Sequence, residues 1–215
     1  MPEMQSETPF SVEAAHAHLR QADPVLARVI AQIGSFDWRQ RDDPYLAVVR
    51  TIMFQQLAGA AATAIMRRFF AYYGDAEAPP SPAQMLETSD EQFRSTGVSR
   101  QKAGYLRDLA LHIVEGRLDF GELAALSDEA VTTKLTAVKG LGEWSAHMFL
   151  MFHLGRPDVL PVGDLGVRNG MRVAYGLEEM PTPKQALVIG APWAPYRSVG
   201  SWYMWRVTEP VAQDI

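Results

Sequence analysis

Apolar residues recur at three- and four-residue spacing along most of this chain, and proline or glycine interrupts the pattern at short intervals. This period places apolar side chains on one face of an α-helix, and no long run alternates with the two-residue period of a strand. The pattern therefore predicts an all-α fold. The expected helices are Ser11–Leu19, Asp23–Ile33, Tyr45–Tyr73 with a break near Gln55–Gly59, Ser81–Leu86, a segment capped by Ser89, Lys102–Glu115, Phe120–Leu123, Ser127–Thr136, Glu143–Leu154, Asp164–Tyr175, Pro183–Ile189 and Tyr196–Thr208.

The composition limits the class of protein. The 215 residues, 47% of them apolar, suffice for one substantial core or two small lobes. No apolar run reaches the ~18 residues that span a bilayer, and the N-terminal MPEMQSETPF lacks the basic start and apolar stretch of a signal peptide. The absence of cysteine excludes disulfides, thiolate zinc sites, iron–sulfur clusters and cysteine nucleophiles. We therefore expect a soluble, cytoplasmic, monomeric protein without membrane contacts.

The net charge argues mildly against a nucleic-acid partner. Lysine and arginine number 20 against 25 aspartates and glutamates, which gives a formal charge of −5, whereas many nucleic-acid-binding domains are basic. Acidic residues concentrate in particular segments, and local potential matters more for binding than the total. A basic face on an acidic chain therefore stays compatible with the composition.

A Gly-Leu-Gly turn stands between two apolar helical stretches. Gly140 and Gly142 allow positive φ angles without side-chain clashes, as a tight turn between two helices requires. The second helix then begins near Glu143, and its unpaired N–H groups form a cradle that can accept a phosphate oxygen. Such a cradle reads no base and suits DNA of any sequence. The alternative is an ordinary helix connection in which the glycines only cap.

The residues around this turn carry a resemblance to a known family. The segments are LTAVKGLGEWSA at 135–146 and PVGD at 161–164, with FQQLAGAAA at 54–62, GVSRQKAGYL at 97–106 and APWAPYRSVGSWYMWR at 191–206 in the same order. Together they resemble the helix-hairpin-helix and aspartate signature of the DNA glycosylase superfamily, specifically its 3-methyladenine DNA glycosylase II branch. Because few residues precede Gln55, we expect a compact form without the N-terminal mixed α/β domain of the enterobacterial type.

The resemblance implies a two-lobed helical architecture with a DNA cleft between the lobes. The expected division is a discontinuous terminal lobe, 1–44 with 159–215, and a helical barrel lobe, 45–158, that contains the helix-hairpin-helix at about 130–154. The phosphate-binding hairpin then comprises Lys139, Gly140, Leu141, Gly142 and Glu143. A bacterial-type location with the chromosome follows from the same resemblance.

Asp164 is the candidate catalytic residue. Breaking an N-glycosidic bond builds oxocarbenium character on the deoxyribose, and a carboxylate beside the sugar stabilises that charge and orients or deprotonates water. Asp164 follows Pro-Val-Gly and precedes an expected helix, so the helix dipole also helps to keep it ionised. The alternative, and the commoner fate of an aspartate in this setting, is a simple N-cap.

Trp144 separates two reaction types within the family. The lyase branches can place a lysine at this position, which attacks C1′ and forms a Schiff base. A tryptophan there implies hydrolysis without strand cleavage, and its indole offers a face for stacking on positively charged alkylated purines. A core tryptophan is the alternative.

The resemblance assigns the remaining site residues. Trp205 falls at a second aromatic wall of the base pocket, whereas Met148 and Leu165 replace aromatic residues of the relative. Leu57 matches the wedge that fills the gap left by an extruded nucleotide. Backbone carbonyls at Thr136, Val138 and Leu141 match those that hold a structural sodium or potassium ion in the family, and no cofactor is otherwise required.

The sequence thus predicts a monofunctional glycosylase of base excision repair. It would flip alkylated bases such as 3-methyladenine and 7-methylguanine out of double-stranded DNA and hydrolyse their glycosidic bonds, leaving abasic sites. Two alternatives stay open. One is a bifunctional or mismatch-type glycosylase on the same fold, which needs a nucleophilic lysine or a different pocket. The other is a non-enzymatic helix-hairpin-helix DNA-binding module, which is typical of duplicated hairpins without a downstream aspartate.

Overall fold

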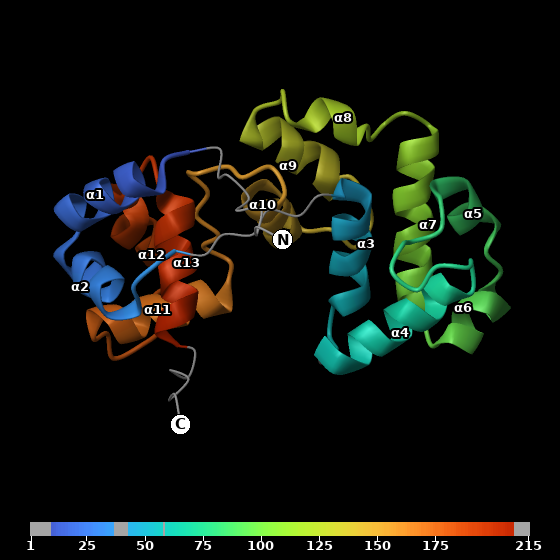
Figure 1. Cartoon of the computed structure of the whole chain (residues 1–215), viewed down its shortest axis with the longest axis horizontal. Coiled ribbons are helices and arrows are strands. Elements are labelled where there is room, and N and C mark those ends of the chain that lie inside the picture. The colour runs from blue at the N-terminus through green and yellow to red at the C-terminus, as the bar shows by residue number, and fades with distance from the viewer. Residues whose placement is uncertain (1–9, 37–42, 58, 209–215) are drawn as a thin grey trace, which may run out of the picture. The chain divides into compact units, whose positions relative to one another are not determined.

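The computed structural model describes residues 10–36, 43–57 and 59–208, and every regular element within these ranges is a helix (Figure 1). The predicted all-α class is therefore confirmed. In the same ranges no helix is both long and apolar enough to cross a membrane.

The chain divides into two compact units. These are a terminal unit, Met1–Gln40 with Leu150–Ile215, and a middle unit, Arg41–Phe149. The sequence prediction had placed residues 150–158 with the middle lobe.

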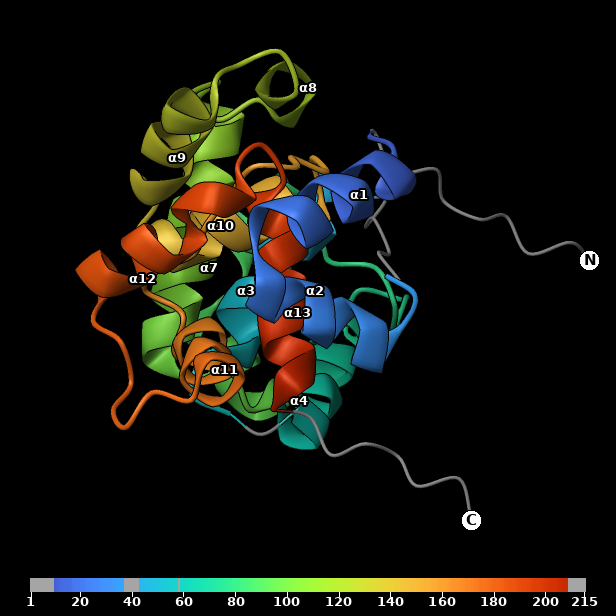
Figure 2. The same ribbon diagram turned by 90° about the vertical axis from the view of Figure 1, so that its left-hand side faces the viewer.

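The terminal unit joins helices from both ends of the chain. Its elements are α1 (Val12–Ala22), α2 (Pro24–Ile33), α11 (Leu165–Tyr175), α12 (Pro183–Gly190), the short 3₁₀ helix η1 (Ala191–Trp193) and α13 (Arg197–Val207). The side chains of α13 are buried from Ser198 to Met204, and this helix packs against α2 and α11 (Figure 2). A helix buried nearly all round forms the centre of a core rather than its cover.

Small residues let α11 and α13 approach closely. A Cβ atom on Gly170 of α11 would lie 2.0 Å from the Met204 carbonyl oxygen of α13. No real side chain tolerates such a contact, so the two backbones touch only because residue 170 is glycine. This packing fixes the helix that Asp164 precedes.

Asp23 ties three segments of the terminal unit together. Its Oδ1 caps α2 by accepting the Val25 and Leu26 N–H groups at 2.8 and 3.1 Å. Its Oδ2 accepts from the Trp193 indole at 2.9 Å and from the Tyr175 hydroxyl. Burial alone would raise the pKa of Asp23, but these hydrogen bonds to the ionised form outweigh it and hold the pKa below 3.8.

The middle unit is assembled around α7. Its helices are α3 (Pro44–Phe54), α4 (Gly59–Ala71), α5 (Pro82–Glu87), α6 (Asp90–Thr96), α7 (Arg100–Val114), α8 (Phe120–Leu123), α9 (Asp128–Thr136) and α10 (Glu143–Phe152), whose last residues pass into the terminal unit. Helix α7 contacts α3, α5 and α6 (Figure 1). The core between them contains Phe69, Phe70, Phe93 and Leu106.

The local sequence signals placed most helix ends within a few residues. Pro24, Pro44 and Pro82 each occupy a first helical turn, and Ser11 and Ser89 accept the capping hydrogen bonds expected of them. The predicted break near Gln55 is present as the gap between α3 and α4. The short helix η1 was not predicted, because Ala-Pro-Trp carries no helical period.

Candidate active site

The Gly-Leu-Gly turn is a helix-hairpin-helix connection between α9 and α10. After α9 the Leu141 N–H donates to the Val138 carbonyl at 3.1 Å, which closes a tight turn over Gly140. The Gly142 carbonyl then accepts the first helical bond of α10, from the Ala146 N–H at 3.1 Å. The N–H groups at the start of α10 have no partners earlier in that helix, so the hairpin ends in a set of donors.

The two glycines of the turn play different parts, which corrects the expectation that both supply positive φ angles. Gly140 has a φ of 84°, whereas Gly142 is not among the positive-φ glycines of the described chain. A Cβ on Gly140 would lie 2.3 Å from the ring of Tyr105, which packs directly against this turn. A Cβ on Gly142 would meet nothing within 4 Å. Gly140 shapes the turn, and Gly142 leaves its outer side open.

Two polar side chains that sequence reasoning did not select hold the hairpin. Asp108 of α7 accepts the Lys139 N–H at 2.8 Å through Oδ2, and the Lys139 ammonium lies 3.5 Å from Oδ1. The Gln55 amide donates to the Gly140 carbonyl at 2.7 Å. Gln55 and Tyr105 lie in the segments 54–62 and 97–106 that had been singled out, but no sequence pattern identified their contacts with the hairpin.

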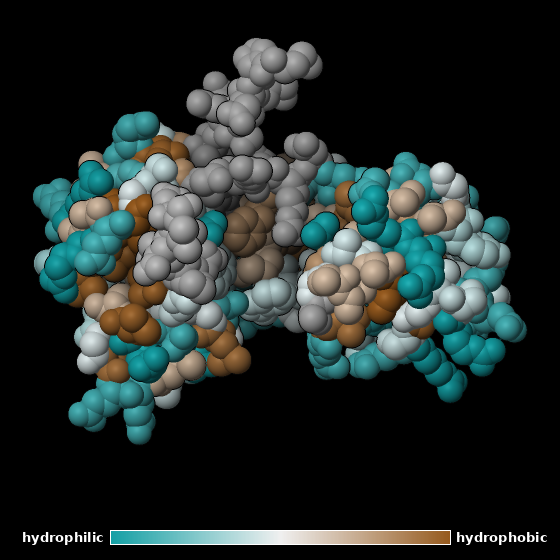
Figure 3. Space-filling model, turned by 60° about the horizontal axis from the view of Figure 1, so that its bottom comes forward, coloured by the Kyte–Doolittle hydropathy of each residue, from teal (hydrophilic) through white to brown (hydrophobic). Residues whose placement is uncertain are grey.

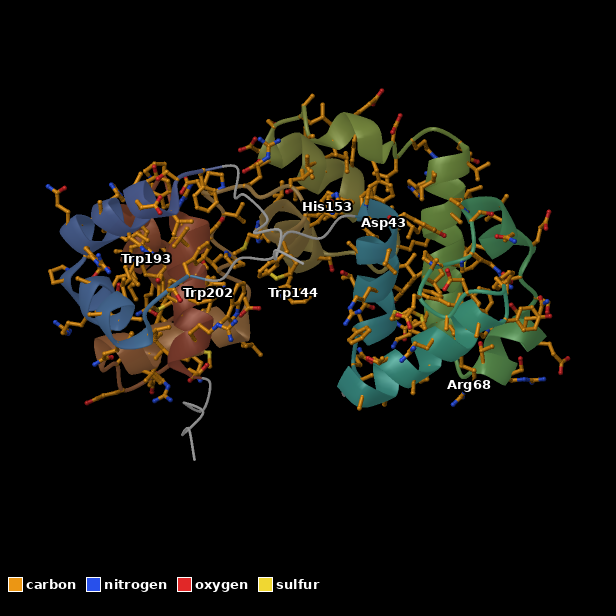
Figure 4. The ribbon with its side chains drawn as sticks, viewed as in Figure 1. Asp43, Arg68, Trp144, His153, Trp193 and Trp202 are labelled. Carbon is orange, nitrogen blue, oxygen red and sulfur yellow. The ribbon has the colours of Figure 1, made fainter. Side chains whose placement is uncertain are left out.

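Trp144 is placed at the first turn of α10 (Figure 4). Its side chain is 46% exposed, unlike that of a core tryptophan. Glu143 beside it is also exposed, and Met148, one turn further along, is half-buried. Nearly half of the Trp144 surface is thus exposed, and its stacking role stays a prediction.

Leu57 lies in the turn between α3 and α4. Gln55 ends α3, and Gln56 has a φ of 57°, in the left-handed region that side chains other than glycine seldom adopt. Leu57 follows with 40% of its surface exposed. An exposed leucine on a tight turn suits a wedge better than a core position.

Asp164 is the N-cap of α11. The sequence predicted this position both for a catalytic carboxylate and for a simple capping residue. Its Oδ1 accepts the Val167 N–H and the Trp205 indole N–H, both at 2.8 Å. The Trp205 ring stacks on Phe152, with centroids 5.7 Å apart and an interplanar angle of 29°. A Cβ on Gly166 would lie 2.8 Å from Trp205, so glycine is required for the indole to fit there. The carboxylate is thereby held in one orientation.

The predicted residues fall into two sets, one in each unit. The hairpin, Trp144, Met148 and Leu57 belong to the middle unit, and Asp164, Leu165 and Trp205 belong to the terminal unit. Leu165 is 63% exposed on α11, next to the cap. Phe152 and Gly166 complete the setting of Trp205 and were not predicted. For Gly166, the sequence did offer a signal, namely a glycine two residues after Asp164. For Phe152 it offered none.

The carbonyl groups proposed for a monovalent cation all belong to the hairpin region. Val138 already uses one carbonyl lone pair for the Leu141 N–H, and a carbonyl oxygen has a second. Within the described part of the chain, no cluster of three or more His, Cys, Asp or Glu side chains forms a metal site. Hard carbonyl oxygens fit sodium or potassium, and the ion at Thr136, Val138 and Leu141 stays a prediction.

Comparison with known proteins agrees with the geometry of the hairpin and the aspartate. A family model for HhH-GPD superfamily base excision DNA repair proteins matches residues 49–195. This chain belongs to the HhH-GPD superfamily. The matched region contains Leu57, the hairpin and Asp164, whereas Trp205 lies beyond its end.

Members of the superfamily resemble this chain over nearly its whole length. DNA-3-methyladenine glycosylase 1 of Schizosaccharomyces pombe is 31% identical over 211 residues, which cover 96% of this chain and 92% of the relative. The solved structure of an S. pombe 3-methyladenine DNA glycosylase in complex with abasic DNA has a TM-score of 0.80 at 31% identity, covering 90% of this chain and 95% of the other. A Bacillus halodurans DNA-3-methyladenine glycosidase has a TM-score of 0.81 at 38% identity, with coverages of 93% and 90%.

Proposed function

We propose that this HhH-GPD protein is a monofunctional DNA glycosylase that removes alkylated bases, such as 3-methyladenine and 7-methylguanine, from double-stranded DNA and leaves abasic sites. The observation that carries the proposal is Asp164, a carboxylate fixed at a helix N-terminus by Trp205 and Val167. Two similar proteins with this activity in their names support the substrate class: the S. pombe 3-methyladenine DNA glycosylase, solved with abasic DNA, and the Bacillus halodurans DNA-3-methyladenine glycosidase.

The carboxylate supplies charge where the reaction needs it. As the N-glycosidic bond breaks, positive charge develops on the deoxyribose, and an ionised aspartate beside it stabilises that charge. The Trp205 and Val167 N–H donors at 2.8 Å restrain Oδ1, so little reorganisation is needed during the reaction. The same carboxylate can accept a proton from the attacking water.

Trp144 accounts for the preference for alkylated bases and for the absence of lyase chemistry. A methylated purine carries positive charge, which the electron-rich face of an exposed indole attracts. Tryptophan has no amine and forms no Schiff base, so the abasic product is released without strand cleavage. Trapping with borohydride on damaged DNA should accordingly yield no covalent protein–DNA adduct.

The hairpin binds the phosphate backbone of DNA and is therefore independent of base sequence. The open side of Gly142 and the donors at the start of α10 admit a phosphate oxygen. A sodium or potassium ion on the Thr136, Val138 and Leu141 carbonyls would add positive charge next to that phosphate. The roles of Met148, Leu165 and Trp205 in binding the base rest on the family resemblance.

The test is Asp164→Asn. Asparagine is a comparable N-cap, and its Oδ1 can still accept from Val167 and Trp205, so both hydrogen bonds can persist while the negative charge is removed. We expect single-turnover release of methylated bases to fall by at least about 10²-fold. Affinity for a duplex with a tetrahydrofuran abasic-site analogue should stay within a few-fold of wild type.

The matched control is Asp119→Asn. Asp119 caps α8 by accepting the Gly121 N–H at 2.8 Å, so the same change is made at a helix N-terminus in the middle unit. This variant should release bases at the wild-type rate. Near-wild-type release by Asp164→Asn would contradict the mechanism, and a wild-type protein without release would contradict the function itself.

A further inference from the structure

A hydrogen bond joins the turn that carries Leu57 to the hairpin. The Gln55 side-chain amide donates to the Gly140 carbonyl at 2.7 Å, across 85 positions of the sequence. Gln55 is half-buried and is the C-cap of α3, and Gly140 is the residue over which the hairpin turns. The Gln55 amide therefore connects the turn that carries the proposed wedge, Leu57, to the hairpin that is proposed to bind phosphate.

A second side chain fixes the same turn from α7. The Lys102 ammonium donates to the Met53 carbonyl at 2.6 Å, near the end of α3. Burial lowers the pKa of Lys102, which fits an ammonium directed toward a carbonyl rather than toward solvent. Helices α3 and α7 are also in contact, so the end of α3 is held by packing and by this bond.

The turn between these two bonds has a strained backbone. Gln56 has a φ of 57°, and it is the one residue other than glycine with a positive φ in the described part of the chain. Such a conformation persists only where the surrounding structure enforces it, and it is found at functional sites. Lys102 on the Met53 carbonyl and Gln55 on the Gly140 carbonyl enforce it on the side preceding Gln56.

We propose that Gln55 is a positioning residue that locks the Leu57 turn to the hairpin, so that wedge and phosphate cradle meet DNA as one rigid element. This inference rests on the proposed function. A wedge enters the duplex productively only at a fixed offset from the phosphate that the hairpin grips, because the target nucleotide is extruded at that offset. The Gln55 hydrogen bond to the Gly140 carbonyl is the direct link from this turn to the hairpin backbone.

The test is Gln55→Met, which keeps the length of the side chain and removes its donor. We expect single-turnover base release to fall about tenfold, because a Leu57 turn that moves relative to the hairpin adopts the productive offset less often. Affinity for undamaged duplex should change less than twofold. Leu57→Ala should lower release as well, and the double variant should be no slower than the slower single variant, because both changes disable the same insertion step.

A second measurement does not depend on catalysis: amide hydrogen exchange in the DNA-free protein, compared between wild type and Gln55→Met. The Leu57 N–H donates to Phe54 and the Leu141 N–H donates to Val138, so each amide reports on one side of the link. Both should exchange faster in Gln55→Met. Gln84→Met is the matched control, because the Gln84 side chain accepts the Ser81 N–H at 2.9 Å in α5 of the same unit. It should change neither exchange nor release.

The outcomes separate the link from the function. Unchanged exchange at Leu57 and Leu141 in Gln55→Met would overturn the link, and so would independent, multiplicative effects of Gln55→Met and Leu57→Ala on release. A wild-type protein that neither releases methylated bases nor prefers the abasic-analogue duplex would overturn the proposed function. In that event faster exchange at both amides would still support the link.

Discussion

At the scale of single residues, the hairpin depends on what surrounds each glycine. Gly140 combines a φ of 84° with the ring of Tyr105, against which a Cβ would lie 2.3 Å away. Both conditions exclude a side chain, one through the backbone and one through packing. Gly142 meets neither condition, since its Cβ position is open. Its smallness matters only to a partner that approaches from outside.

Gly140→Ala should therefore destabilise the fold, and Gly142→Ala should not. Alanine at 140 adds the cost of a left-handed backbone to that of displacing Tyr105, and we expect a loss of about 2–4 kcal/mol in the free energy of unfolding. Alanine at 142 should cost about 1 kcal/mol or less. Urea denaturation followed by circular dichroism measures both.

The same pair of variants tests the phosphate cradle. If a phosphate approaches the open side of Gly142, Gly142→Ala should weaken binding to duplex DNA while stability is retained. Equal stability of the two alanine variants would contradict the role assigned to Tyr105. Unchanged DNA affinity in Gly142→Ala would instead contradict the proposal that a phosphate approaches the open side of Gly142.

At the scale of elements, α7 holds the hairpin through Asp108. Its carboxylate accepts the Lys139 N–H at 2.8 Å and lies 3.5 Å from the Lys139 ammonium. The Asp108 side chain is 13% exposed, so its interactions are less screened by water than those of a surface pair. The His112 imidazole also approaches it, at 3.5 Å. This carboxylate is the polar connection from α7 to the turn.

Asp108→Ala should cost about 1.5–3 kcal/mol of stability, as expected when a backbone N–H loses a hydrogen bond to a charged acceptor. Asp90→Ala is the comparison. Asp90 pairs with Arg107 at 2.6 Å, but its side chain is 73% exposed, so its loss should cost less stability than the loss of Asp108. Equal losses in urea denaturation would show that Asp108 adds nothing beyond a surface ion pair.

Sequence patterns located the elements better than they located the contacts between them. Pro44 and Ser89 marked helix starts because capping depends on neighbouring residues only. The apolar period found α7 but could not show that Asp108 reaches Lys139, or that Gln55 reaches Gly140, because those bonds join distant segments. Trp205 had been assigned to a pocket wall by resemblance, and its hydrogen bond to Asp164 appears only in the structure.

At the scale of the whole molecule, the net charge of −5 did not decide the partner class. Family membership rests on the match of residues 49–195, which include the hairpin and the aspartate. Hydrophilic and apolar atoms are interspersed over the surface of each unit in the view of Figure 3. A backbone cradle with an open glycine needs few positive side chains, which is how an acidic chain can belong to a DNA repair superfamily.

Each unit also contains a histidine whose pKa is lowered by burial. Burial lowers the pKa of His16, helped by the charge of Arg20, and the Glu13 carboxylate offsets part of that effect. Burial likewise lowers the pKa of His147 in α10, against the opposing charges of Glu143 and Asp128. Both pKa values lie below the ordinary 6.5, so the unfolded chain takes up protons first as the pH falls.

The free energy of unfolding should therefore fall in two stages on acidification. Below pH 6.5 the unfolded histidines bind protons while the folded ones stay neutral, which favours the unfolded state. Asp23, whose folded pKa is lowered, stabilises the fold above the ordinary value of 3.8 and loses that contribution as the pH falls through its folded pKa. Urea denaturation at pH 7, 5.5, 4 and 3 measures both stages.

Two variants assign the stages to their residues. His147→Gln should flatten the dependence between pH 7 and 5, because glutamine binds no proton in either state. Asp23→Asn should lower stability at pH 7 and flatten the dependence below pH 4, since the amide still accepts a hydrogen bond but carries no charge to lose. Stability that rises between pH 7 and 5 in the wild-type chain would reverse the sign of the histidine effect, and with it the inference that both imidazoles are neutral in the fold.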